Sequence, residues 1–555
     1  MKLPQTTDKS YGDLIHDIRK GQIKIPQFQR DFVWSLQKSV ALLDSVIKGY
    51  PIGTFIFWAT KDRLRSVRNL GNEDLPLPKA GDTVWFVLDG QQRLTSLFAA
   101  LNGLTIERDS GQKDDFSKIY VDLNAKDDEQ IVVMNITDKE ADSFIPLKDL
   151  LHGSFSLLAS FPKIHQPKLD EYKKQIEGYR FSIIEVQDIP LDVATEIFTR
   201  INVGGKPLTL FEIMVAKTYD EGKRFDLAQK FEELINNLTP LNYETVSGAT
   251  ILQLISLILR KDCKRHTILQ LEKDEFIGTW PKAIDAIERT VEYFKNTYRI
   301  PVSHLLPYNT LLVPFGYFFS RHPNKPDSKQ KSLLEDFFWR TSLGGRYSSA
   351  VESKLAQDVQ RMDSILQKQS PEYEWGIDLS PKFIIENGWF NAGRSFIKAL
   401  LCLYAYQIPK SFNDNSLVNI SNNWLKQANS KNYHHFFPRS YLGKKGMEEG
   451  KINNIVNIVI VDDYLNKREI KAKSPSIYMK IFANENPNLQ ETLKTHLIEN
   501  LDEFGIWLDD YDLFLSKRAS VISKELEKRL IRRDIDKNGQ ISRADDFEEE
   551  TASYE

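Results

Sequence analysis

The spacing of apolar residues changes once along this chain, and that change constrains its fold more than any other feature of the sequence. Up to about residue 220, short strand-like runs such as 54–58 and 84–88 stand beside segments with helical periodicity. From residue 209 onward the pattern becomes helical, with apolar residues at positions i, i+3 and i+4 in segments such as 225–235 and 283–294. The sequence therefore predicts an α+β protein with a mostly helical middle part.

A chain of 555 residues is longer than one hydrophobic core usually fills, so we expect several domains. These are an α/β N-terminal domain, a helical middle domain, a C-terminal domain with a helical extension, and an acidic, disordered tail. Their expected boundaries are 1–220, 221–429, 430–535 and 536–555.

The composition is typical of a globular protein of the cytoplasm. Hydrophobic residues make up 41% and charged residues 27% of the chain, unlike a disordered or a membrane protein. The N-terminus lacks the apolar segment of a secretory signal, and no apolar run reaches the roughly 20 residues of a membrane-spanning helix. Cys263 and Cys402 are too few for a disulfide framework. We therefore expect a cytoplasmic protein without membrane contact.

Two adjacent histidines near the C-terminal end are followed by two asparagines, as in a compact metal-dependent nuclease centre. A histidine that is neutral near pH 7 can take a proton from water, and we assign this role to His435. We expect His434 and Asn466 to bind a divalent metal, Mg²⁺ or Mn²⁺, that stabilises charge on the phosphate. Asn457 suits bracing the loop and orienting the base through amide hydrogen bonds.

The local pattern around these residues indicates how they come together. A β-branched run at 455–461 predicts a strand that carries Asn457, and 464–470 can form a helix that returns the last ligand. Adjacent residues on a regular strand point to opposite faces, so His434 and His435 share a site only across a bend. The alternative is that one of the two histidines is an ordinary core or surface residue.

The net charge of −3 argues against non-specific nucleic-acid binding over the whole surface, but it allows a local basic face. Between Lys431 and Lys480, ten Lys or Arg residues stand against five Asp or Glu, a balance of 10 − 5 = +5. An ordinary solvated face is the alternative. Four basic residues of this stretch are expected to contact DNA phosphates: Lys467, Arg468, Lys471 and Lys473.

The same stretch resembles the HNH nuclease domain of GmrSD-type, modification-dependent (type IV) restriction endonucleases. The resemblance lies in His-His-Phe-Phe-Pro-Arg-Ser-Tyr-Leu at 434–442 and in the runs 452–457, 466–467 and 474–478. It implies a ββα-metal fold that hydrolyses phosphodiesters. HNH sites commonly have an acidic residue immediately before the base, where this chain has His434, so the identity of the base and the preferred metal stay open.

Near the N-terminus, a strand-like run at 84–88 leads through a glycine into a helical segment. A strand, a tight turn and a helix N-terminus form an anion site, with backbone N–H groups and an arginine directed at a phosphate. Asp89 can hold a cation or polarise water beside that phosphate. The alternative is a structural helix cap with an Asp–Arg pair. The turn reads Asp89-Gly90-Gln91-Gln92-Arg93.

This part of the chain resembles the ParB/sulfiredoxin-like N-terminal domain of the same GmrSD family. The resemblance covers most of residues 10–220 and rests on the runs 25–30, 49–53, 89–93 and 198–205. It implies a domain that binds and hydrolyses a nucleoside triphosphate and thereby licenses DNA cleavage. The implied nucleotide site comprises Asp89, Gly90, Gln91, Gln92 and Arg93, with Asp89 and Arg93 catalytic, and with Gln29, Arg30, Arg200 and Asn202 as weaker additions that suit structural roles equally well.

Two further runs carry weaker signals. Gly-Gly-Arg-Tyr-Ser-Ser at 344–349 also resembles members of the family, and a turn between two helices is the alternative. The acidic run 534–545 has the ligand spacing of an EF-hand-like calcium loop, and a solvated acidic tail is the alternative.

Taken together, these residues predict a nucleotide-gated, metal-dependent endonuclease of bacterial anti-phage defence that cuts modified DNA. With one nuclease centre per chain, cleavage of both strands requires a homodimer. One alternative is a ParB-like, nucleotide-dependent DNA-binding or regulatory protein that does not cleave. Another is an HNH nuclease that acts on RNA.

Overall fold

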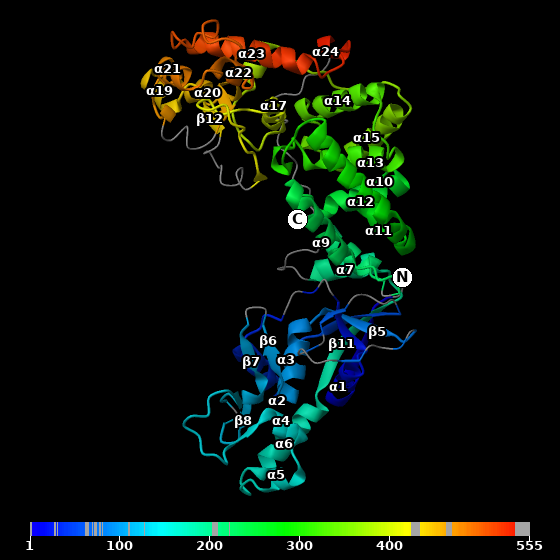
Figure 1. Cartoon of the computed structure of the whole chain (residues 1–555). Helices are drawn as coiled ribbons and strands as arrows, with labels where there is room; N and C mark the ends of the chain where they lie inside the picture. The colour runs from blue at the N-terminus through cyan, green and yellow to red at the C-terminus, as the bar shows by residue number, and fades with distance from the viewer. Residues whose placement is uncertain are drawn as a thin grey trace. The chain divides into compact units, whose positions relative to one another are not determined.

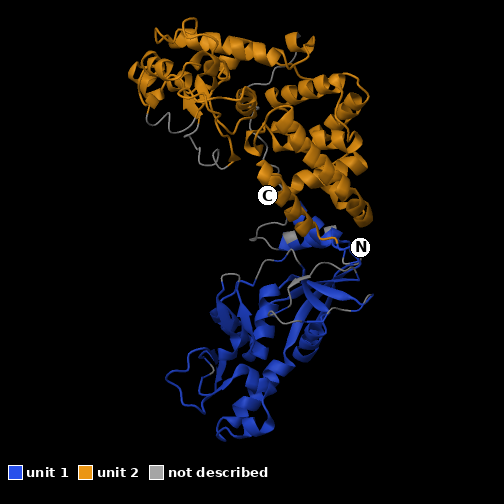
Figure 2. Ribbon diagram, in the orientation of Figure 1, with its two compact units in different colours: residues 1–224 blue, residues 225–555 orange. Residues whose placement is uncertain are grey.

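The chain forms two compact units, Met1–Arg224 and Phe225–Glu555 (Figures 1 and 2). Both helices and sheets are present, so the predicted α+β class is confirmed. The structure is a computed structural model, and it describes residues 3–26, 29, 32–61, 66–68, 70, 75–76, 79, 81–108, 111–126, 128–201, 209–220, 222–422, 433–461 and 469–538.

The first unit is built on a six-stranded mixed sheet in the order β1-β11-β3-β5-β2-β4. β11 pairs with β3 and β2 pairs with β5 in parallel, and the other neighbours are antiparallel. β5 therefore lies inside the sheet, between β3 and β2. The strands are β1 (Gln5–Ser10), β2 (Ile23–Pro26), β3 (Phe55–Thr60), β4 (Ser66–Arg68), β5 (Val84–Asp89) and β11 (Arg180–Gln187).

Side-chain caps explain where several helices of the first unit begin. Oγ of Ser10 accepts a hydrogen bond from the backbone N–H of Asp13, and Thr209 and Glu212 form a reciprocal capping box. The remaining elements of this unit are α1 (Tyr11–Arg19), α2 (Leu36–Ile47), α3 (Gln91–Asn102), β6 (Thr105–Glu107), β7 (Lys113–Asp115), η2 (Phe116–Lys118), β8 (Tyr120–Asp122), β9 (Val132–Val133), β10 (Phe144–Pro146), α4 (Leu147–His152), α5 (Phe155–Ala159), α6 (Gln166–Gly178), α7 (Leu191–Ile201) and α8 (Leu210–Thr218).

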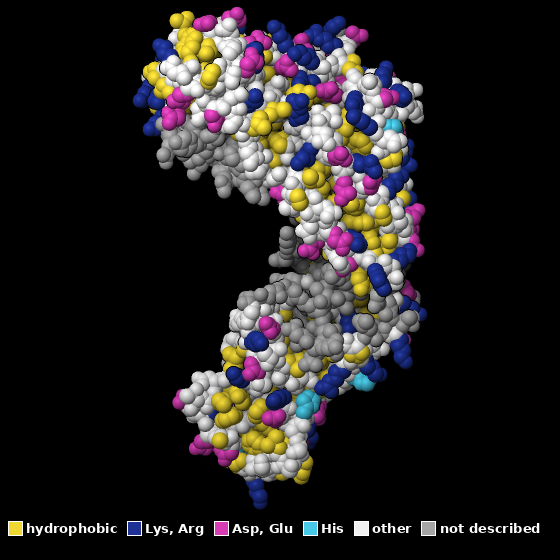
Figure 3. Space-filling model, viewed as in Figure 1, with side chains coloured by type: hydrophobic (Ala, Val, Ile, Leu, Met, Phe, Trp, Pro, Cys, Tyr) yellow, Lys and Arg dark blue, Asp and Glu magenta, His cyan; other side chains and the backbone are white. Residues whose placement is uncertain are grey.

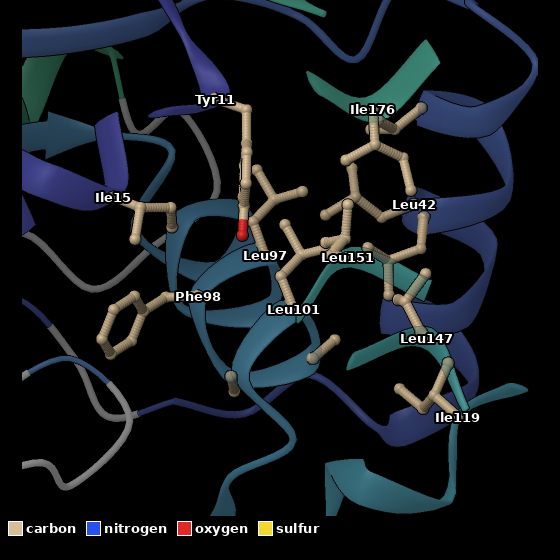
Figure 4. Close-up of a cluster of buried hydrophobic side chains, with 14 of the residues drawn as sticks. Tyr11, Ile15, Leu42, Leu97, Phe98, Leu101, Ile119, Leu147, Leu151 and Ile176 are labelled. Carbon is tan, nitrogen blue, oxygen red and sulfur yellow. The ribbon is translucent and has the colours of Figure 1, made fainter. Parts of the chain in front are cut away.

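An apolar core surrounds α3 (Figure 4). Leu97 and Leu101 of α3 are buried, and Tyr11 of α1, Leu147 of α4 and Ile176 of α6 belong to the same cluster. Because α3 is buried almost all round, its axis is fixed by packing from several directions. The N-terminus of α3, where the run 89–93 lies, is therefore held in a defined position.

The second unit is mainly helical. Its core is rich in aromatic rings, for example Phe294 against Phe315 with ring centroids 4.8 Å apart and Tyr298 against Phe338 at 4.7 Å. Its elements are α9 (Leu227–Leu238), η3 (Thr239–Leu241), α10 (Gly248–Arg260), α11 (Arg265–Leu269), α12 (Lys273–Asn296), η4 (Ser303–Leu305), η5 (Asn309–Leu311), α13 (Leu312–Arg321), α14 (Ser328–Leu343), η6 (Arg346–Ser348), α15 (Val351–Leu366), α16 (Pro381–Glu386), α17 (Ser395–Tyr406), β12 (Tyr433–His435), α19 (Arg439–Lys444), α20 (Glu449–Ile452), η7 (Ile455–Asn457), β13 (Ile458–Ile460), α21 (Pro475–Glu485), α22 (Leu489–Lys494), α23 (Tyr511–Glu527) and α24 (Ile535–Asn538).

A buried ionic network anchors the end of the described chain to α14. The guanidinium of Arg340 donates hydrogen bonds of 2.6 and 3.0 Å to the carboxylate of Asp536. The same carboxylate accepts hydrogen bonds from the backbone N–H groups of Ile377 and Arg533. Asp536 thus belongs to the folded unit, although the sequence places the start of a disordered tail there.

The calcium-loop interpretation of the run 534–545 is not supported by its described part. Asp536 is committed to Arg340, and residues 535–538 form the short helix α24 in place of a loop. The side chain of Asp534 is fully exposed, and residues 539–545 lie outside the described part of the chain.

The run 344–349 forms a structural connection between α14 and α15. The side chain of Arg346 is buried and donates to both carboxylate oxygens of Asp358 at 3.0 Å. The hydroxyl of Tyr347 donates to the same carboxylate at 2.7 Å. These contacts agree with the alternative of a turn between two helices.

The predicted strand at 455–461 is only partly correct. Residues 455–457 form the 3-10 turn η7, and the strand β13 begins at Ile458. The turn forms because Oδ1 of Asn454 accepts a hydrogen bond from the N–H of Val456, and this local contact competes with strand pairing. Asn457 therefore lies in the turn before the strand. No helix in the described ranges is long and apolar enough to cross a membrane.

Candidate functional site

The run 89–93 forms the strand–turn–helix connection that the sequence predicts. Asp89 is the last residue of β5, and α3 begins at Gln91. Gly90 between them has φ = +92°, a conformation that residues with a side chain rarely adopt. A Cβ atom at this position would lie 2.4 Å from the ring of Phe55. The turn therefore requires glycine for two independent reasons.

Arg93 faces the protein from the first turn of α3. It donates hydrogen bonds to the carbonyl oxygens of Ile52 and Thr54, at 2.8 and 3.0 Å, and to Oδ2 of Asp89 at 2.9 Å. Its guanidinium also lies over the ring of Phe55. Arg93 thus ties α3 to the segment before β3. This geometry fits the alternative of a structural Asp–Arg pair more closely than a guanidinium directed at a phosphate.

Asp89 remains the accessible member of this pair. Its side chain is 33% exposed, compared with 18% for that of Arg93. The carboxylate is held at the end of β5 by Arg93 and stands at the N-terminus of α3, where the helix dipole favours an anion. A cation bound by Asp89 or an anion bound at the helix end would meet a surface that is already ordered.

Two glutamines of the predicted nucleotide site have structural contacts. Oε1 of Gln92 accepts hydrogen bonds from the backbone N–H groups of Val33 and Trp34. Nε2 of Gln29 donates to the carbonyl oxygens of Val87 and Leu88. These contacts therefore hold Gln29, Val33 and Trp34 beside the end of β5 and the first turn of α3.

The remaining residues of the predicted nucleotide site are Gln91, Arg200, Arg30 and Asn202. Gln91 is buried in the first turn of α3. Arg200 is exposed and pairs with Glu196 of its own helix at 2.5 Å. Arg30 and Asn202 lie outside the described residues.

The second candidate site is a pocket of about 640 Å³ in the second unit. β12 and β13 form an antiparallel pair in which His434 faces Val459 and His435 faces Ile458. His434 is buried and His435 is half-buried. Both histidines contribute to the lining of the pocket, together with Lys471. The structure therefore brings the two adjacent histidines to one cavity at the end of a short strand.

His435 has the properties of a base that is neutral near pH 7. Burial lowers its pKa below the ordinary value of 6.5, a hydrogen bond to Asn453 raises it, and the charge of Arg439 lowers it further. The net effect is a pKa of His435 below its ordinary value. The imidazole is therefore unprotonated over most of the neutral range and able to accept a proton.

Asn453 is a partner of His435 that the sequence did not single out. Oδ1 of Asn453 lies 3.1 Å from Nε2 of His435, and Nδ2 of Asn453 donates to the carbonyl oxygen of Phe390 at 3.1 Å. A carbonyl oxygen only accepts, so the amide of Asn453 cannot be flipped. Nε2 of His435 must then carry the proton and donate, which leaves Nδ1 with the free electron pair. The run Asn453-Asn454 contained the signal, but only the fold shows which asparagine reaches the histidine.

Asn457 braces the loop that follows His435. Its Oδ1 accepts from the N–H of Phe437 at 2.8 Å, and its Nδ2 donates to the carbonyl oxygens of Phe437 and Ile452. The backbone carbonyl of Asn457 accepts from the N–H of Phe436 at 2.7 Å. All these contacts are with backbone, so the orienting contact to the base comes from Asn453 and not from Asn457.

The predicted metal site is described only in part. His434 lines the pocket, and Asn466 lies outside the described residues. Within the described ranges, no group of three or more His, Cys, Asp and Glu side chains is arranged to hold a metal ion. Glu449 also lines the pocket, and its carboxylate is paired with Arg439 at 2.7 Å. The donor set of one imidazole and one amide oxygen is compatible with a divalent cation that keeps several water ligands.

Among the described residues, Arg439 and Lys471 are the Lys and Arg side chains that line this pocket. Lys471 lines the pocket and is exposed, whereas Lys473 is half-buried. Lys467 and Arg468 lie outside the described residues. On the face shown in Figure 3, basic and acidic side chains are interspersed.

Comparison with known proteins supports the assignment of the first unit. Residues 11–219 match the N-terminal domain of the GmrSD restriction endonuclease family. An uncharacterized protein of Methanocaldococcus jannaschii is 26% identical over an alignment of 595 residues, which covers 93% of this chain and 95% of that protein. The similarity to this relative thus extends through both units.

Proposed function

We propose, from the match of residues 11–219 to the GmrSD restriction endonuclease N-terminal domain, that this chain is a restriction-type DNA endonuclease that cleaves at the His435 pocket. One observation carries the assignment of the cutting site. His435 is half-buried, its pKa is lowered, and Asn453 holds it as one tautomer in a pocket that also contains Lys471. These are the properties that a general base for phosphodiester hydrolysis needs.

In the proposed reaction, Nδ1 of His435 takes a proton from a water molecule. The water oxygen forms a bond to phosphorus as the bond to the leaving 3′ oxygen breaks, and the leaving oxygen gains a proton from solvent. Lys471 attracts the phosphate. A divalent metal, Mg²⁺ or Mn²⁺, would be held by His434 and Asn466 and would supply positive charge to the phosphate oxygens.

We assign nucleotide binding and hydrolysis to the turn at 89–93. The support is the strand–turn–helix geometry, the glycine requirement at Gly90 and the exposure of Asp89 at a helix N-terminus. In this proposal Arg93 acts by holding Asp89 in place. The nucleotide state would license cleavage of modified phage DNA by the second unit.

A cleavage assay tests the proposal. Plain and glucosylated-hydroxymethylcytosine phage DNA are incubated with Mg²⁺ or Mn²⁺, with and without nucleoside triphosphates. His435→Ala is compared with His266→Ala, which removes an exposed histidine of the same unit. We expect His266→Ala to cut like the wild type and His435→Ala to lose cutting. Cleavage that survives His435→Ala would reject His435 as the base.

The same assay separates the proposed nuclease from the alternatives. Nucleotide hydrolysis without any DNA cleavage would favour a nucleotide-dependent regulatory protein. Preferential cutting of RNA would favour the RNA-directed alternative.

The oligomeric state gives an additional test. One nuclease centre per chain nicks a duplex, so double-strand breaks require two copies on one site. Light scattering in the presence of DNA should therefore detect a dimer if double-strand breaks form. Double-strand breaks from a strictly monomeric species would contradict this arrangement.

A further inference from the structure

A second cavity in the Phe225–Glu555 unit, of about 600 Å³, is separate in its lining from the His435 pocket. It lies beside the C-terminal half of α12, the connection from α13 to α14, and the first turn of α14. Its residues come from segments that are distant in sequence, and the helical packing of this unit brings them together.

The lining of this cavity is strongly basic. It contains four cationic side chains and one carboxylate, Glu292, a balance of 4 − 1 = +3. The cations are Arg289, Arg299, Lys325 and Lys331. Because the whole chain has a net charge of −3, a local excess of this size is not a consequence of overall composition.

The two lysines are available to a ligand. Among the described residues, neither Lys325 nor Lys331 forms an ion pair with a carboxylate, and Lys325 is exposed. The two arginines are already held: Arg289 pairs with the carboxylate of Asp285, outside the lining, at 2.7 Å and donates to the carbonyl oxygen of Pro323, and Arg299 donates to that of Tyr406. The cavity therefore combines guanidinium groups that already have partners with ammonium groups that form no ion pair among the described residues.

Aromatic rings and amides line the same cavity. Tyr293 and Phe319 are buried and lie against each other with ring centroids 5.3 Å apart, and Arg299 lies over the ring of Tyr406. The amide groups of Asn296 and Asn324 also reach the lining. Because these rings are already packed, the groups that remain for a ligand are the cationic side chains and the amides, which proteins use to bind the phosphate and the polar edges of a nucleotide.

We propose that this cavity binds the phosphate of a nucleotide, either in a single strand of DNA or as a free nucleoside triphosphate. The proposal deepens the proposed nuclease function, because it gives the helical unit a nucleotide contact apart from the cutting site. An acidic peptide would also meet positive charge here, and the test below therefore includes polyglutamate as a competitor.

The test measures binding alone, in the His435→Ala background, so that its outcome is independent of cleavage. The probes are fluorescein-labelled oligothymidylate, followed by anisotropy, and a fluorescent ATP analogue. Lys331→Glu is compared with Lys329→Glu, which makes the same charge change in the first turn of α14 at an exposed position outside the cavity. Lys325→Glu, on the connection before α14, serves as a second variant if Lys331→Glu does not fold.

We expect Lys331→Glu to weaken binding of at least one probe by about tenfold, and to flatten the salt dependence of DNA binding, because a phosphate contact is lost. Lys329→Glu should bind like its parent. An effect on oligothymidylate alone identifies a DNA strand as the ligand, and an effect on the ATP analogue alone identifies the free nucleotide. Equal binding by Lys331→Glu, Lys325→Glu and Lys329→Glu would overturn the proposal, as would displacement of oligothymidylate from the parent protein by polyglutamate as effectively as by unlabelled DNA.

Discussion

Oδ1 of Asn453 lies 3.1 Å from Nε2 of His435 and accepts a hydrogen bond from this nitrogen. The direction of this hydrogen bond is fixed, because Nδ2 of Asn453 donates to the carbonyl oxygen of Phe390 and the amide therefore cannot be flipped. The pair therefore selects one tautomer of the proposed base and leaves Nδ1 with the free electron pair. Most of the chemical predictions follow from this relationship.

Replacing Asn453 by Leu removes the acceptor but keeps a side chain of similar size. We expect the cleavage rate constant to fall by about 10- to 100-fold, because the imidazole is then free to rotate and to change tautomer. Substrate binding should change little. Asn237→Leu, at an exposed asparagine of the same unit, is the control. A loss of folded protein in place of a lower rate constant would assign Asn453 a purely structural role.

The pH dependence of cleavage should report the lowered pKa of His435. Burial is the largest cause of the lowering, so the imidazole stays neutral below the ordinary pKa of 6.5. We expect the acid limb of the single-turnover rate to fall below pH 6.5. Asn453→Asp should move this limb to higher pH, because a carboxylate favours the imidazolium. An acid limb that Asn453→Asp leaves unmoved would indicate that another group titrates.

His496 should make the second unit sensitive to acid. It is buried, Nε2 donates to the carbonyl oxygen of Lys410 at 2.7 Å, and burial lowers its pKa from 6.5 to about 4. Between these values the unfolded chain binds a proton that the folded chain does not, so the free energy of unfolding decreases as the pH falls from 6.5 to about 4. The contribution of this group is of order 3 kcal/mol.

Urea unfolding followed by tryptophan fluorescence at several pH values measures this effect. His496→Gln should show a smaller loss of stability across the same pH window, and His266→Gln, at an exposed histidine, should behave like the wild type. An unchanged pH dependence in His496→Gln would show that other groups are responsible.

Arg518 should be essential for the stability of the β12–β13 sheet and the turn before it. It is buried in α23 and donates to the carbonyl oxygens of Val456, Ile458 and His496. Arg518→Leu leaves these three acceptors buried without their donor, so we expect a loss of at least about 3 kcal/mol in unfolding free energy. Arg532→Leu, at a side chain that is 76% exposed, is the control. Similar urea midpoints for the two variants would contradict this role.

Substitutions in the 89–93 turn should separate stability from nucleotide binding. Arg93→Ala removes the donors to the carbonyl oxygens of Ile52 and Thr54, and we expect it to lower the unfolding free energy by about 2 kcal/mol. Asp89→Asn keeps an acceptor for Arg93, so it should be nearly neutral for stability while it weakens binding of a nucleoside triphosphate with its metal. Calorimetric melting and nucleotide titration of both variants measure the two effects. Wild-type nucleotide affinity in Asp89→Asn would argue against a nucleotide site at this turn.

Local sequence determined a substantial part of this protein. The strand-like run 84–88, the glycine at position 90 and the apolar helix after it specify a strand–turn–helix connection, because periodicity and backbone freedom act over a few residues. The adjacent histidines and the later asparagines likewise marked the candidate nuclease segment. The strand predicted at 455–461 was too long, since the cap by Asn454 competes with strand pairing.

Tertiary structure decided what individual side chains do. Arg93 was expected at a phosphate, but the segment at 52–54 folds against it and takes its donors. The orienting partner of His435 is Asn453 and not Asn457, because the amide of Asn457 binds the backbone of Phe437 and Ile452. Local sequence thus specified which residue types are present and which elements carry them. Hydrogen-bond partners depend on chain segments that are distant in sequence, and only the fold brings those segments together.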